Sequence, residues 1–170
     1  MTFELMTGII GSLLLLRASI ERTARGELAG MDGGTLPKST HGAAAVLIAW
    51  EAKVTESGPA RPFRVSLASR LKAQLQQPFD IRNGVCHGLA GASVADPGKP
   101  GTSTWEMNGH QQSITRDELQ GVFRWLSNVA CAISMISRAA AELEPVRAAS
   151  LLPGRTWWAA EYGIDLSSLI

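Results

Sequence analysis

The chain has 170 residues, of which 45% are hydrophobic; this suffices for one well-buried core and is too little for two comfortable ones. Sixteen Lys and Arg residues against fifteen Asp and Glu give a formal net charge of +1. This near-balance excludes a global positive field that would draw the protein to nucleic acid or to an anionic membrane, so any recognition of phosphate must be local.

The first predicted element is a helix from Phe3 to Ala24, in which apolar residues recur at steps of three and four. Its apolar run, Leu5 to Leu16, is shorter than the ~20 residues that a membrane-spanning helix needs. Glu4 rather than a basic cluster lies before this run, and no small-residue cleavage pattern follows it. We therefore expect a buried helix in a cytoplasmic protein that does not associate with membranes.

Three further helices are predicted before the middle of the chain. The Gly- and Pro-containing segment 30–40 breaks the first helix, and a second is expected over 42–55. A third is expected over 65–77. Pro78 then interrupts or restarts the helix, because proline lacks an amide donor but is well tolerated in a first helical turn. The fourth helix is expected over 78–89.

The next segment carries the clearest β signal. Residues 90–103 are rich in Gly, Pro and Ser and predict a loop, whereas Asn108-Gly109 between two short β-type runs predicts a tight hairpin over about 103–114. Thr115 followed by Glu118 is typical of a capping box, and it opens a periodic stretch that ends near Leu143. We therefore predict an all-α fold: an antiparallel bundle of about five helices with one inserted β-hairpin. Residues 1–150 form a single domain, and 151–170 form a tail that docks on the bundle or on a partner subunit.

The segment with the clearest potential for chemistry lies on the fourth predicted helix. Ile81, Val85 and Leu89 share one stripe, which should face the core, while Asn83 and His87 share another face. Arg82 and His87 lie five residues apart, which places them roughly 140° apart around an ideal helix. The two side chains therefore flank a surface across which a substrate could lie.

These residue types suit the cleavage of RNA through its own 2'-hydroxyl. The reaction needs a group that takes or gives a proton near neutral pH, for which histidine is the natural candidate. It also needs a permanent cation that grips the phosphorane oxygens with two hydrogen bonds, as a guanidinium does. We assign these roles to His87 and Arg82, with Asn83 orienting His87 or binding phosphate or sugar. No metal or other cofactor is required.

This pattern of an Arg, a polar residue and a His five positions after the Arg, on an inner helix of a small bundle, resembles the HEPN superfamily. The match covers Arg82 to Leu89, with Arg82, Asn83 and His87 at the motif positions. The resemblance implies a helical homodimer in which two motifs line one cleft. In many members it also implies a metal-independent endoribonuclease of a toxin–antitoxin or antiviral defence system, with RNA as the substrate and an antitoxin protein as a possible partner.

Other interpretations remain open at this stage. Arg82 could simply pair with Asp80, and His87 could be a core or C-terminal capping histidine ahead of Gly88. The domain could be a HEPN-type module that binds a nucleotide, RNA or a protein without catalysis. It could also be a structural partner protein that assembles through its apolar N-terminal helix and Trp-rich tail.

Two further groups of side chains have alternative interpretations. Four basic residues before the motif could guide phosphate or simply form a solvated helix face: Arg61, Arg64, Arg70 and Lys72. Among the tryptophans, Trp157 and Trp158 are the expected interface residues, and Trp50, Trp105 and Trp125 are expected to pack inside the domain.

Overall fold

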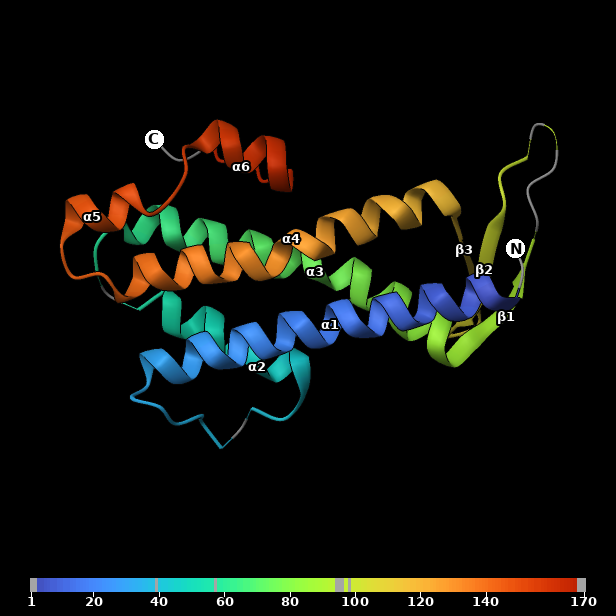
Figure 1. The fold of residues 1–170 in the computed structure, drawn as a ribbon, viewed down its shortest axis with the longest axis horizontal. Coiled ribbons are helices and arrows are strands. Elements are labelled where there is room, and N and C mark those ends of the chain that lie inside the picture. The colour runs from blue at the N-terminus through green and yellow to red at the C-terminus, as the bar shows by residue number, and fades with distance from the viewer. Residues whose placement is uncertain (1–2, 39, 57, 94–96, 98, 168–170) are drawn as a thin grey trace. The chain divides into compact units, whose positions relative to one another are not determined.

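The fold is mostly helical, as expected. A computed structural model describes residues 3–38, 40–56, 58–93, 97 and 99–167. Figure 1 shows the order of the elements along the chain. The helices are α1 (Phe3–Met31), α2 (Gly42–Val54), α3 (Arg61–Gly88), α4 (Arg116–Ala141), α5 (Pro145–Ser150) and α6 (Arg155–Tyr162). The strands are β1 (Leu89–Ala92), β2 (Thr102–Met107) and β3 (His110–Thr115).

Three of the expected helices were wrong in their limits. α1 continues to Met31, past the expected end at Ala24. The predicted break at Pro78 is absent, because α3 is a single helix of 28 residues that passes through this proline. Pro78 is buried, and Leu75 and Ile81 on either side of it are buried as well. The burial of this apolar segment offsets the cost of a proline inside a helix, about 3 kcal/mol.

The expected hairpin is part of a larger sheet. β2 and β3 pair antiparallel around Asn108-Gly109, from Met107 opposite His110 to Thr102 opposite Thr115. Asn108 and Gly109 both have positive φ, as this tight turn requires. The prediction of two strands was nevertheless wrong, because β1 pairs antiparallel with β2 and makes the sheet three-stranded in the order β1-β2-β3. Part of the predicted loop over 90–103 is therefore a strand.

The predicted capping box at the start of α4 is confirmed. The Glu118 carboxylate accepts hydrogen bonds from the backbone amide of Thr115 (2.8 Å) and from its hydroxyl (2.7 Å). In return, the Glu118 amide donates to the Thr115 hydroxyl oxygen at 3.2 Å. These bonds favour the ionised carboxylate and hold the pKa of Glu118 below its usual value.

Replacement of Glu118 by Gln should therefore weaken the fold in a pH-dependent manner. A carboxylate whose pKa is lower in the folded state than in the unfolded state stabilises the fold at every pH above its unfolded-state pKa. This stabilisation is lost as the pH falls through its folded-state pKa. We expect Glu118→Gln to have a lower melting temperature than the parent at pH 7, with the difference shrinking below pH about 4. Thermal unfolding across this pH range tests this, and a difference that does not change with pH would contradict the assignment.

The chain forms two compact units. Unit 1 comprises Met1–Arg17 and Gln76–Ser127, and unit 2 comprises Ala18–Leu75 and Asn128–Ile170. Unit 1 therefore holds the N-terminal part of α1, the C-terminal part of α3, the sheet and the N-terminal part of α4. None of the described helices is both long enough and apolar enough to cross a membrane.

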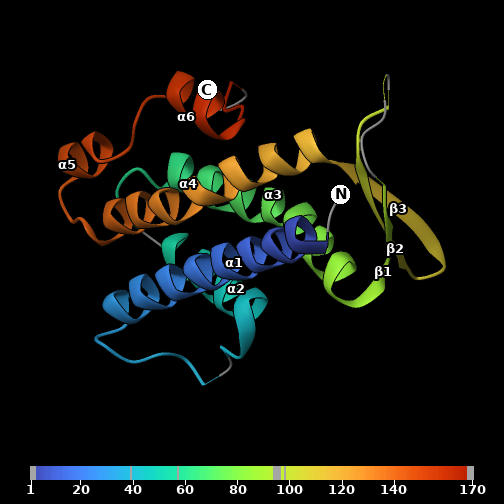
Figure 2. The ribbon, with the colours of Figure 1, turned by 45° about the vertical axis from the view of Figure 1, so that its right-hand side comes forward.

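Unit 2 is a bundle whose helices are linked by polar contacts as well as by an apolar core. The Trp50 indole on α2 donates to the Ser137 hydroxyl on α4 at 2.9 Å. The next residue on α2, Glu51, accepts from the Ser69 hydroxyl of α3 at 2.7 Å. Figures 1 and 2 show the parts of α1, α2, α3 and α4 in this unit lying side by side.

The C-terminal tail packs on the bundle of unit 2 in the same chain. The Tyr162 hydroxyl of α6 donates to the backbone carbonyl of Asn128 on α4, and the Gln74 amide of α3 donates to the carbonyl of Gly163. Trp158 is fully buried, so the expectation that it lies at an interface with another chain was wrong. Trp50 and Trp105 are buried, as predicted.

The four basic residues before the motif do not form one common surface. Arg64 is 1% exposed and donates to four backbone carbonyls of unit 2, those of Val54, Pro59, Glu56 and Ala139. Lys72 pairs with Glu51 of α2. Two members of the proposed phosphate-guiding group are therefore used to join segments of the fold.

Candidate functional site

The motif residues lie in the last three turns of α3, in unit 1. Ile81 and Val85 are 4% and 3% exposed, as the predicted apolar stripe requires. The prediction was wrong for Leu89, the third member of that stripe, which lies in β1 and is only half-buried. α3 also carries Gly84, which is buried, and Gly88 at its last position. These four residues of α3 turn one side of the helix inward and leave Arg82, Asn83 and His87 on the remaining surface.

The sheet packs directly against the motif helix. A Cβ atom added to Gly84 would lie 2.1 Å from the indole of Trp105, and one added to Gly88 would lie 2.1 Å from the carbonyl oxygen of Glu106. Both neighbours belong to β2, so this strand approaches α3 where only glycine leaves room. The inserted strands therefore fix the position of the helix that carries the candidate site.

Arg82 is held by its neighbour in the chain. One terminal nitrogen of its guanidinium donates to the Asn83 side-chain oxygen at 2.9 Å. The Arg82 Nε atom is buried and has no hydrogen-bond partner among the described residues. A buried donor without an acceptor costs roughly 1–3 kcal/mol, and the folded chain retains this cost at Arg82. Asn83 thus orients Arg82, rather than His87 as one of the sequence interpretations had it.

His87 is exposed, and within the described part of the chain it forms neither a hydrogen bond nor an ion pair. It lies in the last turn of α3. Arg82 does not lie near the positive end of a helix, because α3 begins at Arg61 rather than at Pro78. The structure thus places Arg82 in contact with Asn83 and leaves His87 separate from both.

Two of the plainer interpretations are not seen in the structure. Asp80 accepts a hydrogen bond from the Gln76 amide at 2.9 Å, and no contact joins it to Arg82. Because His87 is exposed, it is not a core histidine. Gly88 is the last residue of α3 but does not adopt the left-handed conformation of a typical helix-ending glycine, since the chain continues directly into β1.

Arg17 of α1 was missed by the sequence reasoning. Its guanidinium lies over the Phe79 ring at 5.6 Å from the ring centre, and its Nε atom is buried without a hydrogen-bond partner among the described residues. Phe79 lies one turn before Arg82 on α3, so α1 brings a second guanidinium to the Arg82 side of this helix. In the sequence Arg17 directly follows the apolar run of the first predicted helix, but nothing there shows that it meets Phe79.

The described residues include no cluster of three or more His, Cys, Asp or Glu side chains that could hold a metal ion. In comparisons with known proteins, no family model, no curated protein and no solved structure matched this chain.

Proposed function

We propose that the protein is a metal-independent endoribonuclease of the HEPN type that acts as a homodimer. The observation that carries this proposal is the arrangement on α3: a guanidinium oriented by Asn83 and an exposed His87, both outside the buried stripe of Ile81 and Val85. A cation and a proton-transfer group therefore lie on one helix, outside its buried stripe.

Each residue has a defined part in the proposed reaction. The 2'-oxygen of the ribose attacks the adjacent phosphorus, and the bond to the 5'-oxygen of the next nucleotide breaks, which leaves a 2',3'-cyclic phosphate and a 5'-hydroxyl. His87 takes the 2'-hydroxyl proton or gives one to the leaving 5'-oxygen. Arg82 stabilises the charge on the phosphorane oxygens, and Asn83 is a positioning residue for Arg82. Arg17 supplies a second positive charge on the same side of α3.

A second copy of the chain completes this chemistry. The reaction removes a proton from the 2'-hydroxyl and donates another to the leaving 5'-oxygen, whereas one motif offers a single histidine. Two motifs that face one another would supply both groups, with one His87 as base and the other as acid. If the protein belongs to a toxin–antitoxin pair, an antitoxin that covers this face of α3 would silence it.

The test is cleavage of mixed RNA in EDTA by the purified full chain. Both His87→Ala and Arg82→Ala should lose at least about 100-fold in rate, which is the usual contribution of a general acid–base or a charge-stabilising group. Asn83→Ala should lose less, because the guanidinium remains. His110→Ala is the matched control, since it removes an exposed histidine from the same unit. Full activity in the Arg82 and His87 variants would refute the proposal.

One observation favours a second candidate, a HEPN-type module that binds RNA or a nucleotide without cleaving it. Arg82 and His87 do not contact one another, and a guanidinium held by Asn83 can bind a phosphate without any reaction. In that case the parent would bind RNA without cleaving it, Arg82→Ala would weaken binding, and His87→Ala would change it little.

A further inference from the structure

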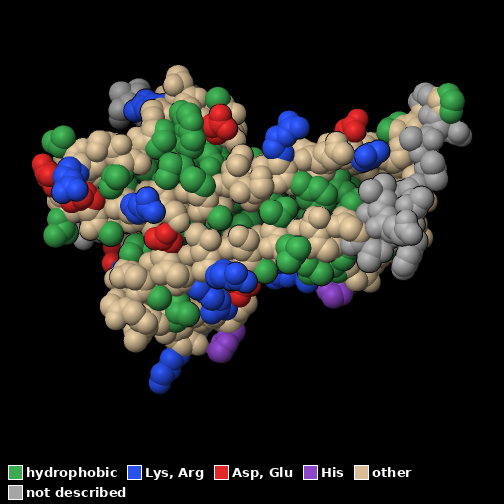
Figure 3. All heavy atoms as spheres, in the orientation of Figure 1, with side chains coloured by type: hydrophobic (Ala, Val, Ile, Leu, Met, Phe, Trp, Pro, Cys, Tyr) green, Lys and Arg blue, Asp and Glu red, His purple; other side chains and the backbone are tan. Residues whose placement is uncertain are grey.

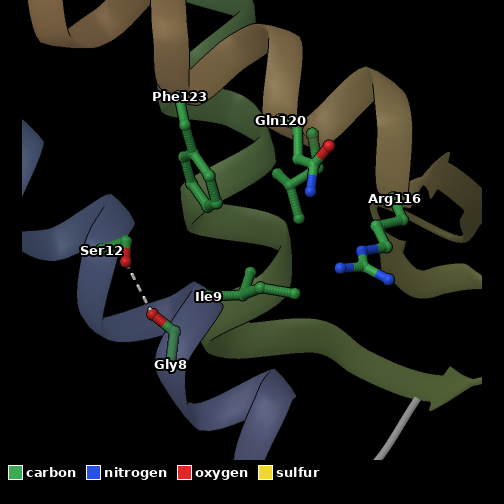
Figure 4. Close-up of a pocket in the computed structure, with 7 residues that line it drawn as sticks. Gly8, Ile9, Ser12, Arg116, Gln120 and Phe123 are labelled. Carbon is green, nitrogen blue, oxygen red and sulfur yellow. Dashed lines mark hydrogen bonds between the residues drawn. The ribbon is translucent and has the colours of Figure 1, made fainter.

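A cavity of about 320 Å³ lies in unit 1, between the N-terminal part of α1 and the first turns of α4 (Figure 4). Its apolar walls are formed by Ile9 of α1 and by Leu119 and Phe123 of α4. Gly8 also lines it, and a Cβ atom at that position would meet nothing within 4 Å, so the space beside α1 is open. Figure 3 shows hydrophobic side chains on the visible surface between α1 and α4 in this unit.

The other end of the cavity is polar. Arg116 and Gln120 lie four residues apart on α4, and Figure 4 shows both side chains reaching into the space from the same side. The Arg116 side chain forms no ion pair or hydrogen bond with any described residue. The nearby Glu118 carboxylate is engaged by Thr115 instead. A guanidinium and an amide donor therefore face the cavity without an internal acceptor.

The remaining polar group does not compete for a ligand. The Ser12 hydroxyl donates to the Gly8 carbonyl at 2.9 Å, so its proton is already used within α1. The cavity thus has an apolar end and an end with one positive charge. Its volume lies at the lower limit of small-molecule sites, which suits a small ligand.

We propose that this cavity binds a small amphipathic carboxylate, separately from the ribonuclease function proposed above. The chain of the ligand lies against Ile9, Leu119 and Phe123, and its carboxylate lies at Arg116 and Gln120. A planar guanidinium can donate two parallel hydrogen bonds to a carboxylate. A single arginine balances one negative charge, which favours a carboxylate over a phosphate dianion.

Calorimetric titration of the full chain with octanoate tests the proposal, with octanol as the uncharged counterpart and octyl phosphate as the dianionic one. We expect saturable one-to-one binding of octanoate. Octanol should bind at least about tenfold more weakly, because it lacks the charged carboxylate whose hydrogen bonds with Arg116 strengthen the binding. Octyl phosphate should bind more weakly than octanoate. Arg116→Gln should weaken octanoate binding by at least about tenfold and leave octanol binding unchanged.

Arg124→Gln is the matched control, because it removes the same charge from an exposed position of α4 that does not line the cavity. It should bind octanoate as the parent does. Three results would each overturn the proposal: no saturable binding at about 5 mM octanoate, equal affinity for octanol, or unchanged affinity in Arg116→Gln. Tighter binding of octyl phosphate would assign the site to phosphate amphiphiles and would refute the carboxylate proposal.

Discussion

Replacement of Arg64 by Met is expected to destabilise the fold by about 3 kcal/mol or more. The Arg64 guanidinium is buried and donates at 2.6 Å to the carbonyls of Val54 and Pro59 and at 3.0 Å to that of Glu56. Methionine fills a similar volume but leaves these carbonyls buried without donors. Burial lowers the pKa of Arg64, and the neighbouring charge of Arg61 acts in the same direction.

Arg61→Met is the control for this substitution. Arg61 is one turn earlier on α3, is exposed, and donates to the Thr55 carbonyl at 3.1 Å. Its loss should change the free energy of unfolding by less than about 1 kcal/mol, because an exposed carbonyl can bond to water instead. Urea unfolding of both variants measures the difference. Equal effects in the two variants would contradict the role of Arg64 as the donor that joins α2, the α2–α3 connection and α4.

The features that sequence reasoning predicted correctly are those that depend on neighbours within a few residues. α2 and the long periodic helix after Thr115 follow from apolar residues at steps of three and four. The turn at Asn108-Gly109 follows from the ease with which these two residues adopt positive φ. The capping box follows from the hydrogen bonds between Thr115 and Glu118, three positions later. In each case the favourable local geometry needs no distant partner.

The features that it missed depend on distant segments. β1 has the sequence Leu-Ala-Gly-Ala, which carries no β signal, and it is a strand because β2 pairs with it. Arg64 looks like one of several surface cations until the carbonyls that surround it are placed by the fold. Pro78 resembles a helix start because proline is common there, and only the burial of its surroundings keeps α3 continuous.

The candidate site shows the same division. The buried stripe of Ile81 and Val85, and hence the outward side of the motif, followed from helical spacing alone. The bond between Arg82 and Asn83 and the approach of Arg17 to Phe79 required coordinates. Gly84 and Gly88 at a spacing of four were a visible signal of close packing, but the sequence did not show what packs there.

Replacement of Gly88 by Ala should test how the sheet holds the motif helix. Alanine is preferred over glycine inside a helix by about 1 kcal/mol, so helix propensity alone predicts that the variant is more stable. The new Cβ atom would lie 2.1 Å from the Glu106 carbonyl oxygen, which belongs to the backbone of β2 and cannot rotate away. We therefore expect a loss of about 3 kcal/mol, together with a loss of any activity that depends on Arg82 and His87.

Gly121→Ala supplies the matched control on α4 of the same unit, because a Cβ atom there meets nothing within 4 Å. It should raise the free energy of unfolding by about 0.5–1 kcal/mol.

Gly84→Ala adds a second comparison, since its clash is with the Trp105 side chain. In a Trp105→Leu background the Gly84 substitution should become nearly neutral, whereas Gly88→Ala should remain destabilising, because no side-chain change at Glu106 removes a carbonyl. If thermal unfolding showed that Gly88→Ala is as stable as Gly121→Ala, β2 would not restrain the motif helix.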